Sequence, residues 1–380
     1  MGLVLTEDQQ MLKSSAADFV KKESPVARVR QLRDSDDPAG YSPQLWAKMA
    51  ELGWPAILIP EEYGGLGMGN VELACVLEEF GRNLVPEPLL STVLLGANAV
   101  LLGGSDQQKK EILPSVADGT RTMTLAWQER GSRYDRTVSA TRAVRSGTGY
   151  RISGEKTLVL DGATASTLVV VARTSGGERD AAGLSLFLVE RGAAGLTVVP
   201  QKTMHLRPSS IVRLSDVEVP ASAMIGNEGG GAAVVEDTLD RATVGLCAEM
   251  LGNMRATFEM TLEYLKTRKQ FGVPIGSFQA LKHRAAKVYV ELELARSAVL
   301  GAATALDNAA ADARALVSVA KARCSDAAVL TGYEGVQMHG GIGMTDEHDI
   351  GLYLKRMRGS EMTFGDAAWH RDRFASLQGF

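Results

Sequence analysis

The residues best suited to chemistry lie in the stretch Tyr264–Gln279, which reads Tyr-Leu-Lys-Thr-Arg-Lys-Gln-Phe-Gly-Val-Pro-Ile-Gly-Ser-Phe-Gln. Arg268 and Lys269 precede Gly272 and Pro274, which interrupt a long helical pattern. A guanidinium next to free backbone amides at such a junction can bind a phosphate or another anion. The alternative is a solvated helix end, where the helix dipole favours cations.

A second group of suitable residues lies in the loop Gln337–Gly343, which reads Gln-Met-His-Gly-Gly-Ile-Gly. Gly340 and Gly341 allow the backbone to approach a ligand closely, because they lack a Cβ atom. The Gln337 side chain carries both a hydrogen-bond donor and an acceptor. The alternative is an ordinary turn between two helices.

The composition is that of an ordinary globular protein, since 45% of the 380 residues are hydrophobic and 23% are charged. The net charge of −4 disfavours a nucleic-acid partner. The five histidines lack metal-site spacing, and Cys75, Cys247 and Cys324 indicate reduced, buried thiols. Met1–Gln10 has no signal-peptide pattern, and no apolar run is long enough to span a bilayer. We therefore expect a cytoplasmic protein without a metal site.

Hydrophobic periodicity divides the chain into three regions. A helical period runs to residue 119 and begins with a capping pattern at Thr6–Gln9. Between residues 120 and 228 the period changes to about 2, and one of these β-rich runs is Arg136–Arg145. Long helical patterns return from residue 229. The predicted class is α+β, with an N-terminal α-helical domain (1–119), a middle antiparallel β domain (120–228) and a C-terminal four-helix bundle (229–380).

Four ordered motifs resemble the signatures of the acyl-CoA dehydrogenase family. They are Gly53–Gly67, Gly149–Lys156, Arg268–Gly272 with Phe278-Gln279, and Gln337–Gly343 with Thr345 and Glu347. Together they cover nearly the whole chain and occur in a helix, strand and helix context. The resemblance therefore implies the fold of this family and the α,β-dehydrogenation of an acyl-CoA thioester.

The resemblance also implies an FAD that lies across a subunit interface. One chain holds the isoalloxazine ring, and the other holds the pyrophosphate and the adenine. In this sequence the nucleotide-binding role falls on Arg268, Gln270, Phe271, Gln279, Gln337, Gly340 and Gly341. Arg268 can donate two parallel hydrogen bonds to phosphate oxygens. Electron-transfer flavoprotein is the implied electron acceptor.

The residues expected around the flavin ring depart from the family pattern. The family usually has a threonine where this chain has Gln128, and a Gly-Ser pair where it has Arg133-Tyr134. An aromatic residue and a hydroxyl are replaced by Leu158 and Leu160, which cannot donate a hydrogen bond. These changes predict an altered ring site.

The catalytic base also departs from the pattern. Removing the proton α to the thioester carbonyl needs a carboxylate, but the position of the usual glutamate is occupied by Phe364. Asp240, early in the first long C-terminal helix, is the candidate base, and Glu361 is a weaker candidate. The alternative for Asp240 is a helical ion pair with a neighbouring cation such as Arg241.

The chain keeps the nucleotide-side motifs but lacks the usual base and has an altered ring site. In this it resembles one subunit of the heteromeric (α2β2) acyl-CoA dehydrogenases of actinobacteria, which act on steroid-derived acyl-CoAs. This resemblance implies a heterotetramer in which a homologous subunit supplies the base and the ring site. Two alternatives stay open: a self-sufficient homotetramer with Asp240 as base, and a non-catalytic acyl-CoA-binding relative. Nucleic-acid binding, which one branch of this fold shows, is the least favoured, and a membrane partner is not expected.

Overall fold

The N-terminal part of the computed structural model is helical, and the model describes residues 4–35, 37 and 39–380. Thr6 begins the first helix as predicted, because its hydroxyl accepts a hydrogen bond from the Gln9 N–H and the Gln9 side chain accepts one from the Thr6 N–H. The helices are α1 (Glu7–Glu23), α2 (Val26–Asp34), α3 (Pro43–Glu51), α4 (Asn70–Asn83), the π-helix η3 (Leu90–Ala97), α5 (Asn98–Gly103) and α6 (Asp106–Ala117).

The middle of the chain forms an eight-stranded sheet in the order β6-β7-β3-β2-β4-β5-β8, with β1 paired to β4. Most pairs are antiparallel as predicted, but β1 and β2 both pair parallel to β4. The strands are β1 (Met123–Ala126), β2 (Arg142–Ser146), β3 (Gly149–Leu160), β4 (Thr167–Arg173), β5 (Leu184–Glu190), β6 (Leu196–Gln201), β7 (Ser209–Pro220) and β8 (Met224–Ile225).

The strand expected at Arg136–Arg145 is wrong in its first half, since β2 begins only at Arg142. The preceding residues instead wrap around the buried Glu129 carboxylate. This carboxylate accepts hydrogen bonds from the backbone N–H groups of Ala140 (2.7 Å) and Thr141 (3.0 Å). A buried carboxylate with such partners outcompetes a strand ladder for the local backbone.

The C-terminal part is a helical bundle, built from α7 (Gly231–Thr267), α8 (Gln279–Asp307), α9 (Ala313–His339), α10 (Ile350–Met362) and α11 (Ala367–Leu377). Helix α7 packs directly against α4 of the N-terminal part. A Cβ atom at Gly81 would lie 2.0 Å from the Glu249 carbonyl oxygen, and one at Gly252 would lie 1.8 Å from that of Glu78. Glycine at both positions therefore permits the close crossing of the two helices.

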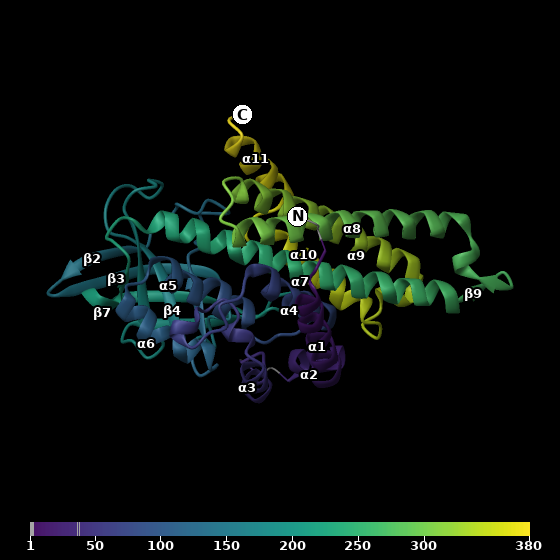
Figure 1. Cartoon of the computed structure of the whole chain (residues 1–380), viewed down its shortest axis with the longest axis horizontal. Helices are drawn as coiled ribbons and strands as arrows, with labels where there is room; N and C mark the ends of the chain where they lie inside the picture. Colours follow the sequence, from purple (N-terminus) through teal and green to yellow (C-terminus); the bar gives the residue numbers. More distant parts are fainter. Residues whose placement is uncertain (1–3, 36, 38) are drawn as a thin grey trace.

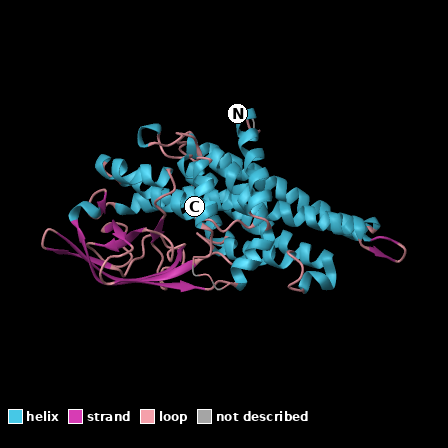
Figure 2. Cartoon of the chain, turned by 90° about the horizontal axis from the view of Figure 1, so that it is seen from below, coloured by secondary structure: helices cyan, strands magenta, loops and turns pink. Residues whose placement is uncertain are grey.

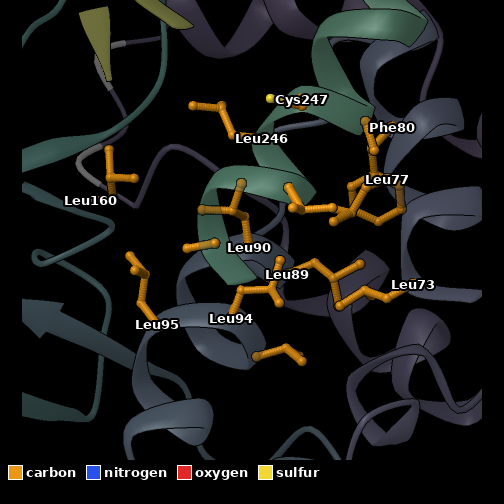
Figure 3. Close-up of a cluster of buried hydrophobic side chains, with 14 of the residues drawn as sticks. Leu73, Leu77, Phe80, Leu89, Leu90, Leu94, Leu95, Leu160, Leu246 and Cys247 are labelled. Atoms are coloured by element: carbon orange, nitrogen blue, oxygen red, sulfur yellow. The ribbon is translucent and has the colours of Figure 1, made fainter. Parts of the chain in front are cut away.

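One hydrophobic core joins the N-terminal and C-terminal helices. Figure 3 shows Leu77 and Phe80 of α4 beside Leu246 and Cys247 of α7, with Leu90 of η3 nearby. All five side chains are almost fully buried. The two helical regions therefore form one packed body, although the whole sheet separates them in the sequence.

The sheet and the far end of the bundle lie at opposite ends of the long axis (Figure 1). The small hairpin of β9 (Lys269–Gln270) and β10 (Val273–Pro274) projects from the end away from β2 and β3. Figure 2 shows the sheet lying along one side of the helices. In the part of the chain that the structure describes, no helix is long and apolar enough to cross a membrane.

Candidate functional site

Arg268 follows α7 at the base of the projecting hairpin, where its carbonyl oxygen accepts a hydrogen bond from the Ile275 N–H at 2.8 Å. Phe271 and Gly272 both adopt positive φ angles (53° and 81°), which produces the tight turn expected at Gly272. The Arg268 side chain is exposed and has no hydrogen-bond or ion-pair partner among the described residues. Its guanidinium is therefore free to bind an anion.

The Gln337–Gly343 loop lies at the same end of the bundle. The ring of Tyr264 on α7 stacks on that of His339, at the end of α9, with a centroid distance of 4.6 Å. The structure thus brings together the two motifs that the sequence singled out. The seven predicted nucleotide-binding residues share one property, which is exposure on this chain: Arg268, Gln270, Phe271, Gln279, Gln337, Gly340 and Gly341.

The two glycines of this loop have different requirements. Gly340 has a φ angle of 63°, so its backbone conformation favours glycine. Gly341 has no such φ angle, and a Cβ atom on either glycine would meet nothing within 4 Å. This chain therefore leaves open space beside the loop, as an external ligand or subunit would need.

A separate cavity of about 290 Å³ lies between the sheet and the C-terminal helices. Among the described residues, its lining contains no aspartate or glutamate. It holds six positions where the sequence departs from the family pattern or where the family's base is expected. The lining residues are Leu95, Leu125, Trp127, Gln128, Arg133, Tyr134, Leu158, Leu160, His205, Ser209, Gly359, Met362, Thr363 and Phe364.

The polar side of this cavity is occupied by the chain's own contacts. The Gln128 side-chain amide donates a hydrogen bond to the Arg133 carbonyl oxygen at 2.9 Å. The Arg133 guanidinium lies over the Tyr134 ring, 5.6 Å from its centroid, and 3.8 Å from the Asp366 carboxylate. These bulky side chains occupy the region in which the resemblance places small residues around a flavin ring.

The opposite side is apolar. Leu158 adopts a φ angle of 51° at an irregularity of β3 and is half-exposed, whereas Leu160 is buried. Neither side chain can donate a hydrogen bond to a ring nitrogen. The residues of this cavity therefore do not fit the polar edge of an isoalloxazine ring, whereas those at the far end of the bundle fit the nucleotide half of FAD.

Phe364 lies where a carboxylate base would be expected. Its φ angle is 62° and that of Gly365 is 117°, so the backbone makes a tight turn that presents residue 364 to the cavity. The structure thus keeps a cavity-facing turn at this position but places an aromatic ring on it. A phenyl ring cannot accept a proton at any pH.

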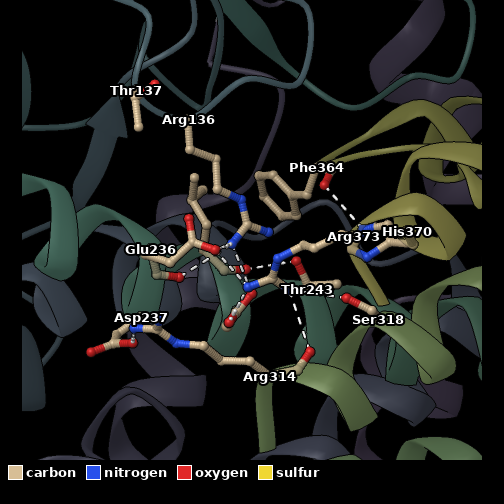
Figure 4. Close-up of polar contacts among 12 residues, drawn as sticks. Arg136, Thr137, Glu236, Asp237, Thr243, Arg314, Ser318, Phe364, His370 and Arg373 are labelled. Carbon is tan, nitrogen blue, oxygen red and sulfur yellow. Dashed lines mark hydrogen bonds and ion pairs between the residues drawn. The ribbon is translucent and has the colours of Figure 1, made fainter. Parts of the chain in front are cut away.

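Asp240 is buried and is not among the residues that line this cavity. It belongs to an ion-pair cluster, and Figure 4 labels its partners Arg136 and Arg373. Its two carboxylate oxygens accept from Arg136 at 2.8 Å and from Arg373 at 2.7 Å. Glu236, one turn earlier in α7, pairs with the same two arginines. The prediction that Asp240 acts as a base gains no support from this position. Glu361 also lies outside the lining and pairs with Arg358 at 2.8 Å.

Sequence reasoning missed His205, which lines the cavity opposite Gly359. A Cβ atom at Gly359 would lie 2.3 Å from the His205 ring, so the two residues are in contact. Burial and the charges of Arg356 and Arg207 lower the pKa of His205 to about 3. The imidazole is therefore neutral near pH 7. No local pattern could have revealed this contact, since it joins a loop after β6 to helix α10.

Three family models match consecutive parts of the chain. The N-terminal domain of acyl-CoA dehydrogenases matches residues 6–120, the middle domain matches 124–217 and the C-terminal domain matches 229–376.

No group of three or more possible metal ligands occurs among the described histidine, cysteine, aspartate and glutamate residues.

Individual relatives agree with the family models. The probable acyl-CoA dehydrogenase YngJ of Bacillus subtilis is 32% identical over 98% of both chains. A solved structure of a Tcur3481-Tcur3483 steroid ACAD variant has a TM-score of 0.87 and 30% identity over 98% of both chains. The ChsE4-ChsE5 complex from Mycobacterium tuberculosis has a TM-score of 0.89 and 28% identity over 100% of both chains. The chain therefore belongs to the acyl-CoA dehydrogenase family, whose members are FAD-dependent oxidoreductases acting on acyl-CoA.

Proposed function

We propose that this chain is the cofactor-completing subunit of a heteromeric acyl-CoA dehydrogenase. The observation that carries the proposal is the cavity lining, which contains no carboxylate among the described residues and has Phe364 on the turn where the base is expected. In this assembly a homologous subunit supplies the base and the ring site. The present chain supplies the groups that bind the pyrophosphate and the adenine.

The remaining polar groups of the cavity cannot replace the base. A general base works best when its pKa lies near the working pH. The pKa of His205 is lowered to about 3, so its basicity is too weak for this task. A guanidinium group has donors but no acceptor for a further proton, and Gln128 and Ser209 carry no group that ionises near pH 7. Removal of a proton from the α carbon of an acyl-CoA thus requires a residue from outside this cavity.

The position of the nucleotide-binding residues favours an intersubunit cofactor. Arg268 directly follows α7, and Gln337 lies in the last turn of α9. The hairpin of β9 that follows Arg268 projects from the end of the molecule opposite β2 and β3 (Figure 1). FAD supplies the hydride acceptor of the reaction when it is bound. In the proposed assembly the Arg268 guanidinium binds the pyrophosphate of a flavin whose ring contacts the partner.

The relatives support the heteromer and suggest its substrate. One similar structure is a complex of two named proteins, and another is described as a steroid ACAD. A steroid-derived acyl-CoA is therefore the first substrate class to test, and electron-transfer flavoprotein is the proposed electron acceptor. A heterotetramer with a homologous subunit, located in the cytoplasm, completes the proposal.

The deciding experiment compares the purified chain with and without a co-expressed homologous subunit. We expect flavin absorbance and acyl-CoA-dependent flavin reduction only in the co-purified complex. A chain that binds one FAD per subunit when purified alone, and reduces it with an acyl-CoA, would overturn the proposal. That outcome would instead support the homotetramer alternative, and Asp240→Asn would then test the predicted base.

A non-catalytic acyl-CoA-binding protein is the second candidate, and the apolar cavity favours it. Seven apolar side chains line this space beside six polar ones, and the apolar ones are Leu95, Leu125, Trp127, Leu158, Leu160, Met362 and Phe364. Thermal stabilisation by an acyl-CoA in a complex that contains no flavin would support this candidate. The same measurement with free CoA is the control, because it separates binding of the acyl group from binding of the nucleotide.

A further inference from the structure

Lys321 of α9 is a fully buried lysine that forms no ion pair with any described residue. Its ammonium group donates hydrogen bonds to the carbonyl oxygens of Glu361 (2.8 Å) and Gly365 (2.7 Å) and to the Ser325 hydroxyl (3.3 Å). Burial of an ammonium without a counter-ion is unfavourable unless all its protons are used. The two carbonyls belong to one turn, Glu361–Gly365, which we call the cavity turn.

A second buried side chain contacts the same turn. His370 of α11 is fully buried, and its Nε2 atom lies 3.2 Å from the Phe364 carbonyl oxygen. Because a carbonyl oxygen can only accept, Nε2 must carry the proton. Two side chains from two helices therefore bind three carbonyl groups of one short turn.

The cavity turn needs such support, because its backbone is unusual. A positive φ angle is uncommon for a residue with a bulky side chain, and Phe364 has one of 62°. The next position has no room for a side chain. A Cβ atom at Gly365 would lie 2.6 Å from the Trp369 ring and 2.9 Å from His370 Nε2, so only glycine fits there. The conformation thus persists through contacts made by the rest of the structure.

We infer that Lys321 and His370 are positioning residues, which hold the cavity turn so that the side chain at position 364 faces the cavity. They act through the backbone of the turn and do not themselves line the cavity. Their effect is to set the shape of the space available to an acyl group. This inference concerns the geometry of one chain and holds whichever subunit contains the flavin ring.

The test measures the environment of Phe364 directly. The chain contains nine phenylalanines, so uniform labelling with 4-fluorophenylalanine gives a ¹⁹F NMR spectrum that can be assigned. Phe364→Leu identifies the resonance of interest by its loss. The spectrum is recorded on the full-length chain in the assembly in which it purifies, and melting temperature is measured in parallel.

We expect Lys321→Met and His370→Leu to shift, broaden or split the Phe364 resonance. His370→Gln should preserve it, because the glutamine amide can still donate to the Phe364 carbonyl oxygen. Lys287→Met, at an exposed position of α8, is the matched control and should also preserve it.

The inference is overturned if the Phe364 resonance stays unchanged in Lys321→Met and His370→Leu while the melting temperature falls. In that case both side chains only fill the core. Equal spectra for His370→Gln and His370→Leu would also contradict it. If Lys321→Met does not fold, the two His370 variants decide the question. Flavin content, measured separately, reports on the proposed function, so the two can fail independently.

Discussion

The Asp240 carboxylate lies 2.7 Å from the Arg373 guanidinium, which joins helix α7 to the last helix of the chain in a buried ion pair. Arg373 is one of two arginines that contact this carboxylate, and both lie within about 6 Å of the Trp369 ring centroid. Both Asp240 carboxylate oxygens already accept hydrogen bonds from these guanidinium groups. Charge-assisted hydrogen bonds of this kind are among the stronger ones in proteins.

Asp240→Asn should therefore reduce stability more than it affects catalysis. Removing one charge from a buried cluster leaves both arginines poorly compensated, and we expect a loss of about 3–5 kcal/mol in the free energy of unfolding. Urea denaturation measures this loss. Asp237→Asn is the matched control, since Asp237 is 45% exposed and has Arg314 as its ion-pair partner among the described residues, so its loss should be below about 1 kcal/mol. A stable Asp240→Asn variant whose complex has lost turnover would restore Asp240 as a base.

Arg268→Ala should lower the FAD content of the assembled enzyme. Loss of a charge-assisted hydrogen bond pair weakens binding by about 1.5–3 kcal/mol, or roughly 10- to 100-fold in Kd. The measurement is flavin absorbance per protein after dialysis. Lys266→Ala is the control, because Lys266 is exposed on the same helix end and only pairs with Glu263 at 3.8 Å. Equal flavin content in wild type and Arg268→Ala would contradict the anion-binding function of this hairpin.

Lys321 should make stability rise with pH. Burial lowers its pKa from 10.5 to about 8, despite the opposing influence of Cys247, Cys324, Glu361 and Asp366. Between pH 8 and 10.5 the unfolded chain binds more protons at this site than the folded chain, so the free energy of unfolding increases with pH. The full gain is about 3 kcal/mol.

Chemical denaturation at several pH values between 7.5 and 10 measures this effect. The quantity compared is the free energy of unfolding of wild type minus that of Lys321→Met. The difference should change across this range, whereas that between wild type and Lys287→Met should stay constant, since Lys287 is exposed. Parallel pH profiles for wild type and Lys321→Met would show that this lysine keeps an ordinary pKa.

Asp161→Asn should stabilise the protein at neutral pH. Asp161 is buried, accepts a hydrogen bond from the Ser91 hydroxyl at 2.5 Å and has a φ angle of 51°, which asparagine tolerates well. Burial raises its pKa from 3.8 to about 6. The folded state therefore disfavours the ionised form, and stability falls as pH rises from about 4 to 6.

At pH 7.5 the asparagine variant should be more stable by about 1–3 kcal/mol, and the advantage should shrink at pH 5. Thermal or urea unfolding at the two pH values tests this. Asp216→Asn is a close control, because Asp216 also has a positive φ angle (53°) and bonds a serine hydroxyl, but is exposed. A destabilised Asp161→Asn at pH 7.5 would mean that the ionised carboxylate is well compensated.

Sequence patterns predicted the elements wherever one face of an element is apolar. The capped start at Thr6 and the break at Gly272 are local features, and both are confirmed. Strand β1 escaped detection because all four of its residues are buried, so it shows no alternation. Its parallel partner β4 is also buried throughout, but its seven residues include three consecutive valines, which mark it as a β-rich run.

The candidate site was less predictable for a different reason. The surroundings of Asp240 depend on Arg136 and Arg373, which lie far away in the sequence and reach it only after the sheet and α11 have packed. Spacing within one helix cannot reveal such partners. The cavity turn was located through Phe364, but its contacts with Lys321 and His370 are equally non-local.

The close crossing of α4 and α7 has a consequence for the order of events during synthesis. Gly81 and Gly252 meet only after the entire sheet has been translated, and the core between these helices includes residues from both regions. The first 119 residues therefore lack the packing partners that α7 supplies while they emerge from the ribosome. Cotranslational folding should begin with the sheet, and the two helical regions should then complete each other in one late cooperative step.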